Sequence, residues 1–149
     1  MNQKTLAVEW YDQGWNCAQS VAAAAAVRRG EDPGPALRAA GGFGGGMGRM
    51  QSACGALTGG IIALGATIPQ TGPTGEHKTV LNAAVQSLWR HFTARWECHT
   101  CREILGLESG LHTPEGQAEY RESDLSTRIC RECVHTVDTW LREYHGDSP

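Results

Sequence analysis

Residues 76–97, EHKTVLNAAVQSLWRHFTARWE, make up the longest helical pattern in the sequence. Apolar residues recur in it at intervals of three and four, which places them on one face of an α-helix. They are Leu81, Val85, Leu88, Phe92 and Trp96. A second stripe with this spacing runs from Cys54 to Ile68, and no segment alternates apolar and polar residues as a half-buried strand does. The sequence therefore predicts an all-α fold.

Caps and chain breakers divide the sequence into four to five main helices. We expect them over residues 3–12, 16–29, 52–68, 76–97 and 126–144, with a helical turn at 101–105 and non-helical turns at 31–35 and 69–75. Asn16 with Gln19, and Thr100 with Glu103, have the spacing of capping boxes. Residues 107–124 are predicted to form a polar surface excursion with one turn of helix. All 149 residues are expected to form a single domain, built as a helical bundle.

A glycine-rich loop interrupts this pattern at residues 41–49, GGFGGGMGR. Glycine this dense disfavours helix and strand, so the backbone there must turn sharply or approach another group closely. The loop's N–H groups, with a nearby cation, would suit a phosphate or another anion. The candidate binding residues are Gly44, Gly45, Gly46 and Arg49. Two alternatives are an approach of the loop to the Cys54 sulfur or a bound cluster, and close packing alone.

Composition restricts the function classes. Hydrophobic residues make up 40% of the chain and charged residues 19%, as in ordinary globular proteins, and the net charge of −3 with no basic half argues against nucleic acid as a partner. The N-terminus lacks the apolar core of a signal peptide. The best apolar run, residues 53–68, is shorter than the about 20 residues of a membrane span. We therefore expect a cytoplasmic protein without membrane insertion.

The six cysteines carry the functional signal. In the reducing cytoplasm, such a set is more often metal-binding or redox-active than a static disulfide framework. Cys17, Cys54 and Cys101 are each predicted at the start of a helix, where the dipole and unpaired N–H groups favour the thiolate. The alternative is that a cysteine serves as a small buried hydrophobe, which weighs most for Cys133 in the final helix.

Two Cys-x-x-Cys pairs raise the alternative of a structural zinc site. Cys98 with Cys101, and Cys130 with Cys133, supply four thiolates, as tetrahedral zinc requires. The 28 residues between the pairs exceed the roughly 15–20 of zinc ribbons, and the second pair lies on a long predicted helix.

Taken together, these motifs resemble the family of redox-active proteins named for a C…GCAxxG…C…C signature. The matching segments are NCA at 16–18, FGGGMGR at 43–49, CGALTG at 54–59, CREILG at 101–106 and Cys130. One departure is that the cysteine here precedes the Gly-Ala of the signature. The resemblance implies thiol chemistry, or a metal or iron–sulfur centre, at Cys17, Cys54, Cys101 and Cys130. Cys98 and Cys133 are extras to it.

We predict a redox-active protein, which can be a thiol-dependent oxidoreductase, with Cys54 as the low-pKa nucleophile. One of Cys17, Cys101 and Cys130 would be the resolving thiol. The alternative is a binding module for a metal or an iron–sulfur cluster that uses these four sulfurs as ligands, and the third reading is a structural or partner-binding protein. The sequence leaves open the redox partner or small-molecule substrate and whether the chain forms a homodimer.

Two geometric expectations accompany this reading. The four family cysteines should converge, because a disulfide or a shared metal requires nearby sulfurs. Gly55 and Gly59 each cost a helix interior roughly 1 kcal/mol relative to Ala. We therefore expect another backbone, a cluster or a substrate to lie close to that helix face.

Overall fold

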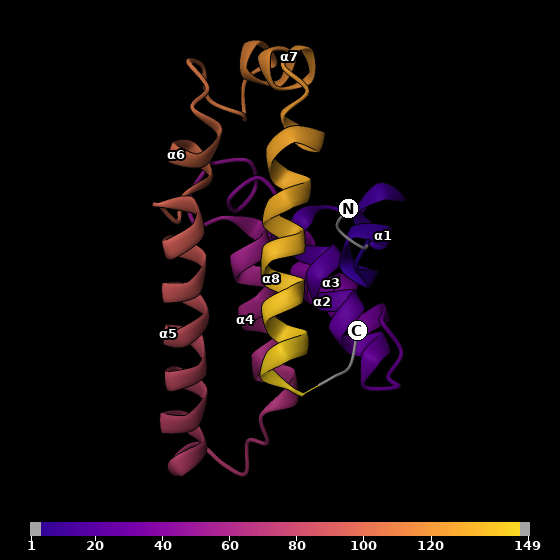
Figure 1. Ribbon diagram of the computed structural model, residues 1–149, viewed down its shortest axis with the longest axis vertical. Helices are drawn as coiled ribbons and strands as arrows, with labels where there is room; N and C mark the ends of the chain where they lie inside the picture. The colour runs from indigo at the N-terminus through magenta and orange to yellow at the C-terminus, as the bar shows by residue number, and fades with distance from the viewer. Residues whose placement is uncertain (1–3, 147–149) are drawn as a thin grey trace.

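The computed structural model describes residues 4–146, and these contain helices and no strand (Figure 1). The helices are α1 (Leu6–Asp12), α2 (Cys17–Arg28), α3 (Gly34–Ala40), α4 (Gly55–Thr67), α5 (Glu76–Trp96), α6 (Cys101–Leu105), α7 (Pro114–Glu122) and α8 (Arg131–Tyr144). A 3₁₀ turn, η1 (Gly41–Phe43), follows α3, and a π-helical turn, η2 (Ser126–Cys130), leads into α8. The all-α prediction is confirmed. Within this range, no helix is both long and apolar enough to cross a membrane.

The described residues form eight α-helices, more than the four to five expected, because several are too short to show an apolar stripe. Helix α3 begins inside the predicted turn at 31–35, since Gly34 and Pro35 are as compatible with a helix start as with a turn. Helix α7 is longer than the one turn expected. It begins at a Thr113 cap, whose side chain accepts the Gly116 N–H at 3.0 Å.

Helix α4 lies at the centre of the bundle. Figure 1 shows α1, α2 and α3 on one side of it, α5 on the other and α8 across the front. Leu57 and Leu64 of α4 are fully buried, as are Leu88 and Phe92 of α5. The stripe that predicted α5 therefore faces the core.

The expected close approach to α4 is confirmed, and the neighbour is α2. A Cβ on Gly59 would lie 2.5 Å from the Ala18 carbonyl oxygen, and a Cβ on Gly55 would overlap the Cys17 sulfur. The two glycines are one helical turn apart, so they form a groove on α4 that receives the start of α2. This groove fixes where Cys17 lies relative to Cys54.

Helix α8 is tied to α2 by a buried ion pair. The two carboxylate oxygens of Asp138, which is fully buried, each accept a guanidinium N–H of Arg28 at 2.5 Å. The Ala7 N–H of α1 donates to the same carboxylate at 3.0 Å. These contacts fix the relative positions of the two helices that carry Cys17 and Cys133.

Candidate functional site, a cavity lined by cysteines

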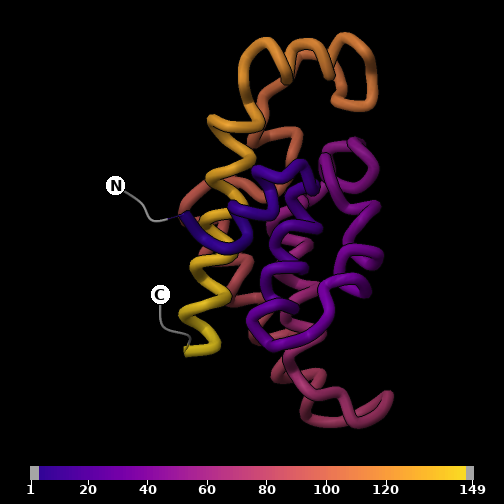
Figure 2. The backbone as a smooth tube through the Cα atoms, turned by 90° about the vertical axis from the view of Figure 1, so that its right-hand side faces the viewer, coloured from indigo at the N-terminus to yellow at the C-terminus, as the bar shows by residue number. Residues whose placement is uncertain are grey.

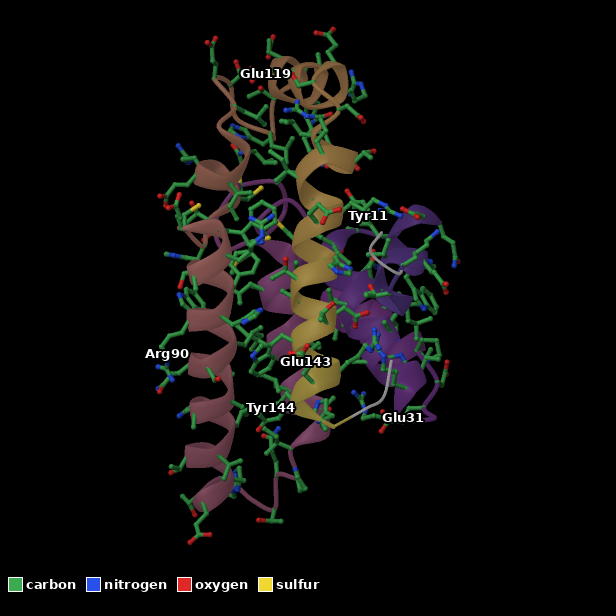
Figure 3. The ribbon with its side chains drawn as sticks, in the orientation of Figure 1. Tyr11, Glu31, Arg90, Glu119, Glu143 and Tyr144 are labelled. Atoms are coloured by element: carbon green, nitrogen blue, oxygen red, sulfur yellow. The ribbon has the colours of Figure 1, made fainter. Side chains whose placement is uncertain are left out.

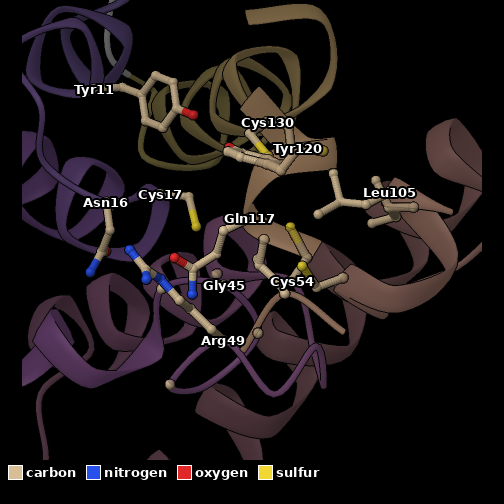
Figure 4. A pocket seen from close by; sticks show the side chains of 18 of the residues that line it. Tyr11, Asn16, Cys17, Gly45, Arg49, Cys54, Leu105, Gln117, Tyr120 and Cys130 are labelled. Atoms are coloured by element: carbon tan, nitrogen blue, oxygen red, sulfur yellow. The ribbon is translucent and has the colours of Figure 1, made fainter. Parts of the chain in front are cut away.

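A cavity of about 590 Å³ lies where the starts of α2, α4, α6 and α8 meet (Figure 4). Five of the six cysteines line it, namely Cys17, Cys54, Cys101, Cys130 and Cys133. The four cysteines singled out from the sequence therefore converge, together with one of the two extras. All six cysteines are free thiols.

A short antiparallel contact brings Cys54 and Cys101 together. The Cys54 N–H donates to the His99 carbonyl at 2.8 Å, and the Cys101 N–H donates to the Ser52 carbonyl at 2.8 Å. Two helices, α4 and α6, thus begin side by side. Their first cysteines open onto the same cavity.

Cys54 has the environment of a reactive thiolate. It is the N-cap of α4, one residue before the helix rather than inside its first turn as expected. The Cys133 thiol, by hydrogen bonding, lowers the pKa of Cys54, and the N–H groups of Ala56 and Leu57 lower it further against the effect of burial. The predicted direction of the shift is confirmed. Its largest cause, Cys133, was not predicted.

The same expectation is wrong for Cys17 and Cys101. Both are the first residue of a helix, yet burial raises the pKa of each, that of Cys101 to about 12. Charge on neighbouring thiolates, Cys54 among them, raises both further. For a buried thiol among other thiols, desolvation and the repulsion of neighbouring thiolates raise the pKa by more than the start of a helix lowers it.

Two tyrosines surround Cys130, and the sequence did not single out either. The Tyr120 hydroxyl of α7 donates to the Cys130 sulfur at 3.4 Å. Burial raises the pKa of Cys130 to about 11, although the Tyr120 hydrogen bond opposes the shift. Tyr11, which shares a 2.5 Å hydrogen bond with Ser126, also faces Cys130, and burial raises its pKa to about 12. No motif marks these tyrosines, because their placement depends on long-range folding.

The two extra cysteines have different positions. Cys133 lines the cavity and is 1% exposed, whereas Cys98 lies outside it and donates its S–H to the Trp96 carbonyl at 3.3 Å. Cys130 ends η2 and is the N-cap of α8, and Cys133 follows three residues later, a helical spacing that could have identified Cys133 from sequence. The hydrogen bond with Cys54 raises the pKa of Cys133, and burial raises it further.

The zinc pattern is only partly assembled, because Cys98 does not join the other three of its cysteines at the cavity. Across residues 4–146, no group of three or more His, Cys, Asp or Glu side chains is arranged to hold a metal ion. A metal or cluster on Cys17, Cys54, Cys101 and Cys130 stays a prediction.

The glycine-rich loop turns in a left-handed sense beside the cavity. Residues 45–49 all have positive φ, between 60° and 70°, including Met47 and Arg49. The Gly48 and Ser52 N–H groups donate to carbonyls of the loop itself at 2.8 Å. Close packing explains part of the glycine content, since a Cβ on Gly46 would lie 2.7 Å from the Ser52 backbone.

The loop approaches a cysteine, but that cysteine is Cys17 rather than Cys54. The Gly45 N–H interacts with the Cys17 sulfur and lowers its pKa against burial. A Cβ on Gly44 would lie 2.7 Å from the Asn16 side chain, so the loop covers the start of α2. Gly44, Gly45, Gly46 and Arg49 all line the cavity, and their role in binding stays a prediction.

These features define a class of protein: an all-helical bundle with a thiol-lined cavity closed by a glycine-rich loop. A family model described as "Putative redox-active protein (C_GCAxxG_C_C)" matches residues 15–144, so the chain belongs to this family. No curated protein and no solved structure matches the chain.

Proposed function

We propose that the protein is a thiol–disulfide oxidoreductase in which Cys54 is the nucleophile. The observation that carries this proposal is the Cys54 sulfur at the N-cap of α4, with a lowered pKa, beside the Cys133 thiol in an accessible cavity. The thiolate is the reactive form in disulfide exchange, so the position of lowest pKa is where attack begins.

The reaction has two exchange steps. The Cys54 thiolate attacks one sulfur of a disulfide R–S–S–R′, forms a mixed disulfide Cys54–S–S–R and releases R′–S⁻, which takes up a proton. A second cysteine then loses its proton and attacks the Cys54 sulfur, releasing R–S⁻. The substrate disulfide gains two electrons and is reduced to two thiols, and the protein loses the same two electrons as it forms one internal disulfide. A dithiol reductant returns the protein to its starting state by the reverse exchange.

The structure adds Cys133 to the candidates for the second cysteine. The sequence limited them to Cys17, Cys101 and Cys130, but the thiol in contact with Cys54 is Cys133. A resolving thiol must reach the sulfur that it attacks, and Cys133 is the thiol whose interaction with Cys54 most affects the pKa of Cys54. We therefore propose Cys133 as the resolving thiol.

The test is to oxidise the reduced protein with hydroxyethyl disulfide and to map the products by mass spectrometry. We expect the native chain to lose two hydrogens and to yield a Cys54–Cys133 disulfide. Cys133→Ser should accumulate the mixed disulfide on Cys54, and Cys54→Ser should react much more slowly. Cys98→Ser is the matched control, because Cys98 lies outside the cavity, and it should behave as the native chain does.

The same samples test the alternative functions. Unchanged oxidation of Cys54→Ser would refute the proposed nucleophile. Stoichiometric iron or zinc in anaerobically purified protein, released by replacing any one of Cys17, Cys54, Cys101 and Cys130, would support the metal or cluster module instead.

A further inference from the structure

Apart from the proposed Cys54 thiolate, the charged side chains on the cavity wall are all positive. Arg49 of the glycine-rich loop and Arg121 of α7 line the cavity, and no Asp, Glu or Lys does. Within residues 4–146 neither guanidinium has an ion-pair partner, whereas Arg28, Arg29 and Arg131 are all paired. Unpaired arginines beside a cavity raise its potential and bind carboxylate or phosphate oxygens.

Arg49 is held at this position in a strained backbone conformation. Its φ is 64°, and its N–H donates to the Gly44 carbonyl at 3.2 Å. A Cβ on Gly45 would lie 2.9 Å from the Arg49 Cα, so the turn closes only around a glycine. A non-glycine residue adopts this backbone conformation only at a cost in free energy, and such residues cluster at functional sites.

One side-chain amide on the cavity wall, that of Gln117, is available to bind a ligand. The Asn16 side chain is occupied, because it donates to the Gly41 carbonyl and accepts the Gln19 N–H. The Gln117 side chain lines the same cavity and has no such partner among the described residues. Figure 4 shows the end groups of Arg49 and Gln117 in the part of the cavity where Cys17 lies.

The remaining walls set the size and polarity of the occupant. Ile104, Leu105 and Leu111 supply an apolar surface, and the volume of about 590 Å³ is in the range of small-molecule pockets. A folded protein disulfide would not enter such a space. In Figures 1 and 2 residues 107–125 (orange) lie across this end of the molecule, above the glycine-rich loop (purple).

We infer that the substrate is a small disulfide bearing carboxylate groups, with a carboxylate held by Arg49 and Arg121 and a sulfur presented to Cys54. This inference rests on the proposed function, and the chemistry is the exchange described above. The guanidinium groups bind the negative end, and the apolar wall receives the short carbon chain.

The test compares three disulfides that have two methylenes between each sulfur and its polar group and that differ in charge. Dithiodipropionate is anionic, hydroxyethyl disulfide is neutral and cystamine is cationic. Single-turnover rates of the reduced protein are divided by the rates of dithiothreitol with the same disulfide, which removes intrinsic reactivity. We expect the normalised rate for dithiodipropionate to exceed that for cystamine by at least on the order of tenfold. High salt should reduce this preference, since the screening length falls to about 3 Å at 1 M.

Substitutions of the two arginines test whether the preference for an anionic disulfide arises in the cavity. Arg49→Gln and Arg121→Gln should each lower the ratio of anionic to neutral rates several-fold. Arg90→Gln is the control with the same change of charge, because Arg90 points away from the bundle on the outer side of α5 (Figure 3). It should leave the ratio unchanged. Circular dichroism confirms folding, and if Arg49→Gln does not fold, Arg121→Gln on the exposed face of α7 decides alone.

The outcomes separate this inference from the proposed function. Equal normalised rates for the three disulfides, or ratios that neither arginine variant changes, would overturn the anionic substrate and leave thiol exchange intact. A reduced protein that none of the three disulfides oxidises would refute the proposed function itself.

Discussion

The thiol of Cys133 in α8 interacts with the sulfur of Cys54 at the N-cap of α4, and this contact is the largest cause of the lowered pKa of Cys54. A thiol that donates a hydrogen bond stabilises the thiolate that receives it. In the proposed reaction, the pair therefore provides both the nucleophile and the second thiol that interacts with it. Through this contact, Cys133 of α8 lowers the pKa of Cys54.

Replacing Cys133 with Ala should slow the reaction of Cys54 near neutral pH. The loss of the hydrogen bond removes a factor that lowers the pKa of Cys54, so the thiolate fraction at pH 7 falls. Alkylation of Cys54 by iodoacetamide, followed by peptide mapping against pH, measures the midpoint. We expect an upward shift in Cys133→Ala and none in Cys98→Ala. An unchanged midpoint in both variants would show that the contact with Cys133 does not lower the pKa of Cys54.

Two glycines of α4 offer a matched pair of substitutions. Gly59→Ala should destabilise the fold and displace α2, since the added Cβ would lie 2.5 Å from a backbone oxygen of Ala18. Gly65→Ala meets only the end of the Gln70 side chain, at 4.0 Å, so it should stabilise the helix by up to about 1 kcal/mol. Urea unfolding measures both. Similar effects of the two changes would show that α2 and α4 are not in close contact.

Stability should fall in alkaline solution. Cys101 and Cys130 have pKa values of about 12 and about 11 in the folded protein, above the about 8.5 of a free thiol. Between these limits the unfolded chain releases protons that the folded chain retains, so raising the pH favours unfolding. Each group contributes a slope of up to about 1.4 kcal/mol per pH unit. Cys101→Ser and Cys130→Ser should each flatten the fall in unfolding free energy above pH 8.5. A fall of native steepness in both variants would contradict the raised pKa values.

The sequence predicted the features that depend on local patterns. Leu88 and Phe92 lie on the buried face of α5 because helical spacing determines that face. The capping box of Asn16 and Gln19 forms at the start of α2 as expected. Four cysteines could be assigned to one site because the resemblance to the family names them together, and all four line the cavity.

The features of the site that the sequence did not predict depend on tertiary contacts. Tyr120 and Arg121 reach the cavity only because residues 107–125 fold over it, and no local pattern encodes that placement. The sequence correctly placed Cys17 and Cys101 at the starts of helices. The pKa of each thiol depends on burial, which local sequence does not show. Cys133 is an extra to the family signature, and its interaction with Cys54 joins residues that are distant in the chain.

The most direct test of the account is the order in which the six thiols of the reduced, metal-free protein alkylate at neutral pH. A limiting amount of iodoacetamide is added, and peptide mapping identifies the first product, with Cys54→Ser as the control. We predict that Cys54 reacts first, with a midpoint below the about 8.5 of a free thiol, and that the fast phase disappears in Cys54→Ser. First reaction at another cysteine lining the cavity, with Cys54 titrating at or above 8.5, would contradict the account and transfer the role of nucleophile to that residue.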